Sequence, residues 1–129
     1  MFFGKSKTKI LVADDDIISR EMLLEVLSDD YEVLEACNGQ EAVEKALVEK
    51  PALILMDFDM PVMNGLRAVN ALRADERTKA VPVVMCTGRG ELENVEALLE
   101  AGADDYVIKP VDPSKLLLKV RAILGGRRR

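Results

Sequence analysis

The sequence predicts an α/β protein with helices on both faces of a parallel sheet. Short, almost wholly apolar runs alternate regularly with amphipathic stretches of helical spacing, a pattern typical of strand–helix units in a parallel sheet. The apolar runs lack the polar residue at every second position that a half-solvated strand shows, so we expect strands buried on both faces. Most of these runs stop abruptly at an acid, a hydroxyl or a lysine.

The first strand is predicted at residues 9–13, and it stops at three consecutive acids, Asp14, Asp15 and Asp16. A helix is expected over residues 17–27, and the favoured role for Asp16 is that of its N-cap. The apolar residues of this helix fall in two adjacent stripes at helical spacing: Ile17, Leu24 and Leu27 in one, Ile18, Met22 and Val26 in the other.

The second strand is predicted at residues 31–36. Asn38 can cap the helix that follows, which runs to about residue 49. Residues 52–56 form the next uninterrupted apolar strand, and it also ends at an acid, Asp57.

The pair Asn64-Gly65 can mark either a hairpin turn or the start of a helix. Leu66, Val69 and Leu72 follow at helical rather than alternating spacing. We therefore expect a third helix here.

The fourth strand is predicted at residues 82–86 and ends at Thr87. The next helix is expected over residues 91–101, with Gly102 as its left-handed stop. Its spacing predicts one inward-facing apolar set: Leu92, Val95, Leu98 and Leu99.

The fifth strand is predicted at residues 106–108 and ends at Lys109. Asp112 and Pro113 begin a last helix, which the glycines from Gly125 terminate. Five strand–helix units thus fill the chain without a linker. They predict a flavodoxin-like (βα)5 doubly wound parallel sheet with strand order 2-1-3-4-5.

Length and charge limit the classes of function. The 129 residues fit a single domain over residues 1–129 with a core at about residues 8–125. The chain has 18 basic and 23 acidic residues and a formal charge of −5, which disfavours direct binding of nucleic acid phosphates. With no histidine, catalysis by His-based triads or by His–metal motifs is excluded.

The two cysteines, Cys37 and Cys86, are too few for a disulfide framework or a four-ligand zinc site. Both are expected to be small core residues in a reducing compartment. Since no apolar run approaches the roughly 20 residues that span a bilayer, we expect a cytoplasmic protein with no membrane contact.

The residues that end the strands form the candidate site. They are Asp14 and Asp15 after the first strand, Asp57 after the third, Thr87 after the fourth and Lys109 after the fifth. In the order 2-1-3-4-5 the first and third strands are neighbours at the switch point of the sheet, where ligands bind. We therefore expect their carboxylates to converge.

Converging carboxylates repel each other and are tolerated when a cation lies among them. Oxygen ligands of this kind suit Mg²⁺ or Mn²⁺, either of which can also accept a phosphoryl oxygen. Asp57, at the centre, is the candidate nucleophile in a phosphoryl transfer, with Lys109 and the Thr87 hydroxyl placed for the phosphoryl oxygens.

The chain closely resembles the receiver domains of bacterial two-component response regulators, the CheY-like family. The resemblance covers about residues 8–125, in family order. It is carried by Val12-Ala13-Asp14-Asp15, Leu55-Met56-Asp57, Met60-Pro61, Met63-Asn64-Gly65, Thr87-Gly88, Gly102-Ala103 and Tyr106-Val107-Ile108-Lys109-Pro110.

The resemblance implies that Asp57 accepts a phosphoryl group from a phosphohistidine of a sensor histidine kinase or phosphotransfer protein. It implies that Asp15, Asp57 and the backbone carbonyl of Asp59 bind Mg²⁺, with Asp14 helping through a water. Such a domain is a signalling switch that catalyses only its own phosphorylation and dephosphorylation, rather than an enzyme acting on other substrates.

Further roles follow from the same resemblance. Thr87 and Lys109 would bind the phosphoryl oxygens, and Tyr106 would swing inward as Thr87 moves. The Lys109-Pro110 bond would be cis. The signal would reach a downstream partner or output domain through the surface of the fourth helix, fifth strand and fifth helix.

Two positions that vary in the family and tune the lifetime of the phosphoryl group are Asp59 and Arg89 here. We expect the two to pair across the mouth of the site and to slow loss of phosphate.

The last helix contains three consecutive leucines, Leu116, Leu117 and Leu118, which is more than a single core-facing stripe of a helix can bury. Part of this run is therefore a candidate surface for docking or for a phosphorylation-dependent dimer.

Three other functions compete with this interpretation. The sequence Asp57-Phe58-Asp59 imitates the Asp-x-Asp of haloacid-dehalogenase-type phosphatases, but the chain is short for a substrate cap. A flavodoxin-like carrier is disfavoured because Asp14 and its acidic neighbours would repel a flavin phosphate. An unphosphorylated interaction scaffold stays open.

Overall fold

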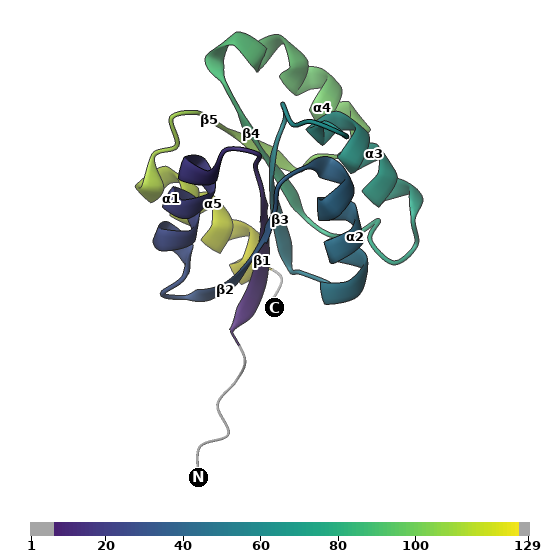
Figure 1. Cartoon of the computed structure of the whole chain (residues 1–129). Helices are drawn as coiled ribbons and strands as arrows, with labels where there is room; N and C mark the ends of the chain where they lie inside the picture. The colour runs from purple at the N-terminus through teal and green to yellow at the C-terminus, as the bar shows by residue number, and fades with distance from the viewer. Residues whose placement is uncertain (1–6, 127–129) are drawn as a thin grey trace.

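The computed structural model describes residues 7–126. Within this range the chain forms one parallel sheet in the order β2-β1-β3-β4-β5 (Figure 1), which confirms the predicted strand order. The strands are β1 (Thr8–Ala13), β2 (Tyr31–Ala36), β3 (Leu53–Asp57), β4 (Val83–Thr87) and β5 (Asp105–Ile108). Their carboxyl ends all lie along one edge of the sheet because every pairing is parallel.

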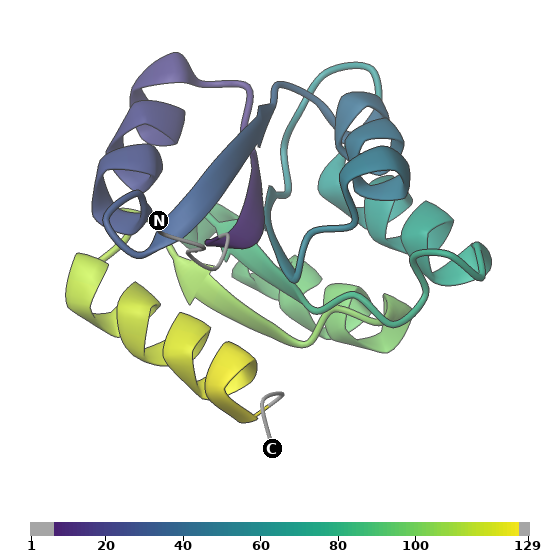
Figure 2. The same cartoon turned by 90° about the horizontal axis from the view of Figure 1, so that it is seen from below.

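The helices cover both faces of the sheet, as Figures 1 and 2 show. One face carries α1 (Ile17–Leu27) and α5 (Pro113–Gly126). The other carries α2 (Gly39–Glu49), α3 (Gly65–Ala74) and α4 (Val95–Ala101). No helix of residues 7–126 is long and apolar enough to cross a membrane.

The core explains why the strand sequences are continuously apolar. Alternate residues of β1 enter opposite sides: Ile10 and Val12 join one buried cluster, and Leu11 and Ala13 the other. The same division occurs in β3 and β4, so each central strand is buried on both faces.

Side chains at the helix starts fix the connections that follow the strands. Asp16 caps α1 by accepting a hydrogen bond from Ser19 N at 3.2 Å. Asn38 and Asn64 cap α2 and α3 in the same way, and Asp112 accepts from the amides that begin α5. Each cap satisfies an amide that the helix itself leaves unpaired.

The segment predicted as one helix at residues 91–101 is divided. It begins as a 3-10 helix, η1 (Arg89–Asn94), and continues as α4. Leu98 is fully buried, but Leu92 and Leu99 are about two-fifths exposed, at 42% and 41%. Because a 3-10 helix turns through 120° per residue, the apolar positions of η1 do not stay in register with those of α4.

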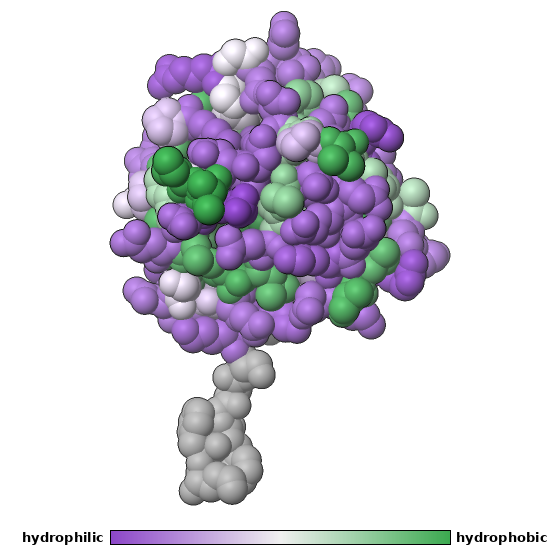
Figure 3. Space-filling model, in the orientation of Figure 1, coloured by the Kyte–Doolittle hydropathy of each residue, from purple (hydrophilic) through white to green (hydrophobic). Residues whose placement is uncertain are grey.

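The core stripe of α1 also differs from the prediction. Leu23 and Leu27 are its buried residues, whereas Ile17, Ile18 and Met22 are exposed. Figure 3 shows apolar surface over α1. Apolar residues occupy most positions of this helix. Spacing alone therefore could not select the inward face.

The prediction that both cysteines lie in the core is correct for Cys86 and wrong for Cys37, which is exposed just after β2. Burial raises the pKa of the Cys86 thiol to about 12. At pH 8 we expect iodoacetamide to alkylate Cys37 in the folded protein and Cys86 only after unfolding. Peptide mass mapping with and without urea checks this, and equal modification of both in the folded state would contradict it.

Candidate functional site

The predicted carboxylates come together at the carboxyl edge of the sheet. Asp57 is the last residue of β3, and Asp14 follows β1, the neighbouring strand. One carboxylate oxygen from each of Asp14, Asp15 and Asp57 lies within 4.8 Å of the other two. Asp14 and Asp57 are buried, at 1% and 6% exposure, whereas Asp15 is exposed.

Lys109 lies between the two buried acids. Its Nζ is 3.0 Å from Asp57 Oδ1 and 3.1 Å from Asp14 Oδ2. The amide of Lys109 donates to the carbonyl of Thr87 at 2.7 Å, and the Lys109-Pro110 bond is cis. The Lys109 ammonium from the segment after β5 thus contacts one acid at the end of β3 and one after β1, so three chain segments meet at one point.

Burial dominates the electrostatics of Asp57. Burial, helped by the charges of Asp14 and Asp15, outweighs the opposing effect of the Lys109 ammonium and leaves the pKa of this carboxyl raised to about 6. For Lys109, burial alone would lower the pKa, but Asp57 and Asp14 reverse this and leave it raised. Asp57 is therefore a carboxylate that is costly to ionise in the folded protein.

This cost predicts that Asp57→Asn stabilises the protein in EDTA at pH 8. Because the folded-state pKa of Asp57 is above its unfolded value, the folded state holds the proton more tightly, and stability is lost as pH rises from about 4 to about 6. Removing the charge should add about 2 kcal/mol to the free energy of unfolding at pH 8 and much less at pH 4. Urea denaturation at the two pH values measures both.

The matched control is Asp59→Asn, because Asp59 is an exposed acid two residues further along the chain. It should leave the unfolding free energy near that of the wild type at both pH values. An equal gain in the two variants would show that net charge, rather than the buried position of Asp57, is responsible.

Thr87 is the last residue of β4. The residue before it, Cys86, is paired with Asp57 of β3, so Thr87 lies beside this acid. The Thr87 side chain is fully buried, and Oγ1 has no hydrogen-bond partner in the described part of the chain. An unsatisfied buried hydroxyl costs about 1 to 3 kcal/mol. A phosphoryl oxygen at this site would provide the missing acceptor, so Thr87 fits its predicted place.

The donor set fits a magnesium ion. Asp14, Asp15 and Asp57 offer hard carboxylate oxygens that are close enough to share one cation. The backbone carbonyl of Asp59 as a further ligand stays a prediction. Zinc or copper would favour imidazole or thiolate ligands, and this site contains neither.

Three further residues were expected to act next to the site: Tyr106 in transmitting the signal, and Asp59 and Arg89 in setting the lifetime of the phosphoryl group. Tyr106 on β5 is half-buried, with Lys119 Nζ 5.8 Å from the centre of its ring. Asp59 and Arg89 are both exposed, and no ion pair joins them among the residues described. The expected pair is therefore wrong for this structure, since exposed charges on separate segments of the chain gain little from pairing in water.

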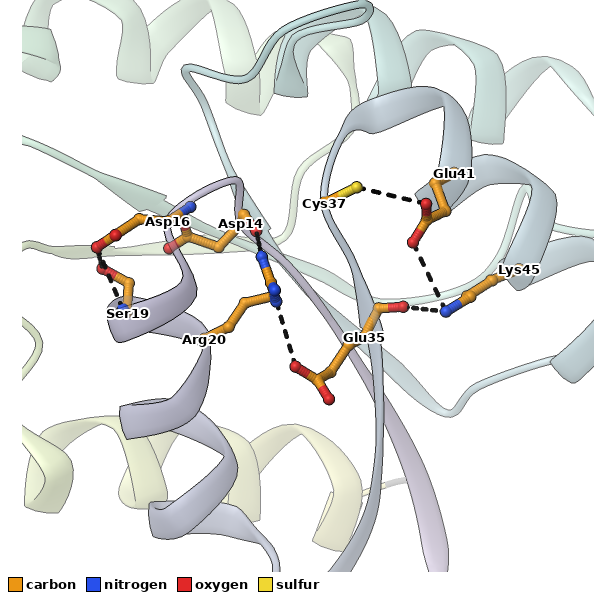
Figure 4. A network of polar contacts seen from close by, with 8 residues as sticks. All are labelled: Asp14, Asp16, Ser19, Arg20, Glu35, Cys37, Glu41 and Lys45. Atoms are coloured by element: carbon orange, nitrogen blue, oxygen red, sulfur yellow. Dashed lines mark hydrogen bonds and ion pairs between the residues drawn. The ribbon is translucent and has the colours of Figure 1, made fainter.

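Sequence reasoning missed a polar network next to the acids (Figure 4). Arg20 on α1 donates from Nη1 to the backbone carbonyl of Asp14 at 2.8 Å and from Nε to Glu35 Oε1 at 3.2 Å. Helical spacing places Arg20 one turn after the cap Asp16, but no pattern indicated its partners.

Comparison with known proteins agrees with this geometry. The family model described as "Response regulator receiver domain" matches residues 10–121. The phosphate regulon transcriptional regulatory protein PhoB of Pseudomonas aeruginosa is 40% identical over 116 residues, which cover 89% of this chain and 51% of PhoB. The chain thus spans about half the length of the curated relatives it matches.

Two solved structures are similar over nearly the whole chain. A putative response regulator from Chloroflexus aurantiacus is 34% identical with a TM-score of 0.88, covering 93% of this chain and 99% of that one. The receiver domain of a sensor histidine kinase from Pseudomonas aeruginosa, with magnesium coordinated in its active site cleft, is 28% identical with a TM-score of 0.86, covering 93% and 99%. The fold, the acids at its carboxyl edge and the matched family model together show that this chain belongs to the response regulator receiver domain family of two-component systems.

Proposed function

We propose that the chain is a switch in which Asp57 is phosphorylated by a sensor histidine kinase or phosphotransfer protein. The observation that carries this proposal is the arrangement around Asp57. Its buried carboxylate faces the Lys109 ammonium at 3.0 Å, and Thr87, at the end of the neighbouring strand, has a hydroxyl without a hydrogen-bond partner among residues 7–126. These groups supply a nucleophile and two donors for phosphoryl oxygens.

In the proposed step, a carboxylate oxygen of Asp57 attacks the phosphorus of a phosphohistidine. The new P–O bond forms as the P–N bond breaks, and the electron pair returns to the imidazole, which takes up a proton. A magnesium ion held by Asp14, Asp15 and Asp57 would neutralise phosphoryl charge. Lys109 exchanges its contact with Asp57 for one with a phosphoryl oxygen, and the Thr87 hydroxyl donates to another.

The output surface in this proposal is formed by α4, β5 and α5. Thr87 and Tyr106 connect it to the site because β4 and β5 are paired, with Thr87 opposite Ile108. Leu118 on α5 is 67% exposed and Ile108 is 38% exposed, so apolar contact area is available there for a downstream protein, an output domain or a second copy. The cytoplasm is the proposed compartment, where such kinases would meet it.

Incubation with acetyl phosphate and Mg²⁺ tests the proposal by intact mass. The wild type and Asp59→Asn should each gain one phosphoryl group that depends on Mg²⁺ and is lost in base, whereas Asp57→Asn should gain none. Steady release of inorganic phosphate that requires Asp59, without an adduct, would instead support a phosphatase. Neither adduct nor release would support an unphosphorylated scaffold.

A further inference from the structure

We propose that Arg20 is a positioning residue for the metal-binding turn, held in place by Glu35. The proposal rests on the function above and extends it to two residues that touch neither the metal ligands' carboxylates nor the phosphoryl group. Arg20 lies on α1 and Glu35 on β2, so the pair joins two elements on either side of the turn after β1 (Figure 4).

The Arg20 side chain is only 16% exposed, and its guanidinium uses two different nitrogens. Nη1 donates to the Asp14 carbonyl at 2.8 Å while Nε donates to Glu35 Oε1 at 3.2 Å. A planar guanidinium fixed at two points has a defined orientation, which a single flexible ammonium cannot reproduce. Arg20 therefore holds the carbonyl of Asp14 at a set position relative to β2.

That carbonyl belongs to the peptide group that joins Asp14 to Asp15. The remaining polar atoms of Asp14 are also engaged: its amide donates to Ala36 O, and its carboxylate accepts from Asp16 N and from Lys109 Nζ. With this peptide plane held by Arg20 and the next amide, Asp16 N, held by Asp14 Oδ1 at 2.9 Å, rotation about the backbone bonds of Asp15 is restricted, and so is the direction of its side chain. Arg20 thus orients the exposed acid of the cluster without touching it.

Charge and position predict opposite effects of removing Arg20. Its positive charge lies near the acids and opposes the binding of a cation, so electrostatics alone predicts tighter Mg²⁺ binding in Arg20→Met. Loss of a group that orients metal ligands predicts weaker binding, typically by 10- to 100-fold for such outer partners. The sign of the change therefore separates the two effects.

The test is the Mg²⁺ dissociation constant from titration calorimetry of the full chain. We expect about a 10-fold rise or more in Arg20→Met, a partial rise in Arg20→Lys, and no change in Arg121→Met, an exposed arginine on α5. Thermal unfolding confirms that each variant is folded. An unchanged or smaller constant in Arg20→Met would overturn the proposal, as would a wild type that binds no Mg²⁺.

Variants of Glu35 test the same geometry with Arg20 intact, in case Arg20→Met does not fold. Glu35→Gln keeps an acceptor for Arg20 Nε and should bind Mg²⁺ almost as the wild type does, whereas Glu35→Met should bind several-fold more weakly. Both lose one negative charge, so equal weakening would show a charge effect and overturn the positioning role.

Hydrogen exchange in EDTA gives a readout without metal. The amides of residues 14–17 should exchange faster in Arg20→Met than in the wild type, and Arg121→Met should leave them unchanged. Unchanged exchange in Arg20→Met would contradict the proposal. Reaction of the wild type with acetyl phosphate distinguishes failure of this proposal from failure of the proposed switch. If the wild type forms the adduct but Arg20→Met matches it in Mg²⁺ binding and amide exchange, only the positioning role is overturned. If the wild type forms no adduct, the proposed switch is overturned.

Discussion

Replacing Gly65 by alanine should destabilise the fold by about 2 to 3 kcal/mol and slow phosphorylation of Asp57. A Cβ at this first residue of α3 would lie 2.4 Å from the backbone oxygen of Asp57, 2.7 Å from Met85 Cε and 3.0 Å from Phe58 Cα. Two of these neighbours are backbone atoms of the segment that holds the nucleophile. Relief of the clash therefore requires β3 and α3 to separate where Asp57 must be held.

Gly90→Ala is the control, because no described heavy atom lies within 4 Å of the Cβ it would add. Urea denaturation should give Gly90→Ala a stability close to that of the wild type, and the acetyl phosphate reaction should run at the wild-type rate. Equal stability of Gly65→Ala and Gly90→Ala would show that the approach of α3 to β3 is not tight.

Lys109→Met should destabilise the metal-free protein by about 3 kcal/mol at pH 8, because it leaves Asp14 and Asp57 buried without their shared cation. The pKa of Asp57, already raised by burial, should rise further in the variant. The loss should therefore shrink at pH 5, where Asp57 takes up a proton in the folded state. Urea denaturation in EDTA at both pH values measures the difference, and Mg²⁺ should restore part of the stability at pH 8.

Lys9→Met is the matched control, since Lys9 pairs with Glu49 in an ion pair whose side chains are both more than a third exposed. Exposed pairs contribute little, so this variant should stay near wild-type stability at both pH values. A loss in Lys109→Met that does not depend on pH would mean that packing of the methylene chain, rather than charge, is what the lysine contributes.

The sheet and the central acids were predictable because they depend on patterns with few alternatives. An apolar run buried on both faces indicates a central parallel strand, and residues that end such strands must share one edge. That reasoning places Asp57, Thr87 and Lys109 at one edge from the sequence alone. Asp16 likewise behaves as the helix cap that its position indicated.

Other features depend on side-chain rotamers or exposure, which sequence patterns do not encode. The Arg20–Glu35 contact requires a long side chain to turn back from α1 to β2. The Asp59–Arg89 pair was expected because the two residues occupy positions that vary in the family, but both side chains are exposed, Asp59 after β3 and Arg89 at the start of η1. The close approach of Gly65 to the backbone of Asp57 and Phe58 depends on how α3 packs against the end of β3, which the sequence pattern does not specify.

Locating the phosphoryl group on the chain tests the central claim most directly. After reaction with acetyl phosphate and Mg²⁺, borohydride reduces an aspartyl phosphate to homoserine, and peptide mass mapping then identifies the position. The proposed switch predicts reduction at Asp57 alone, with none when EDTA replaces Mg²⁺. Reduction at Asp14, at Asp59 or at no residue would contradict it.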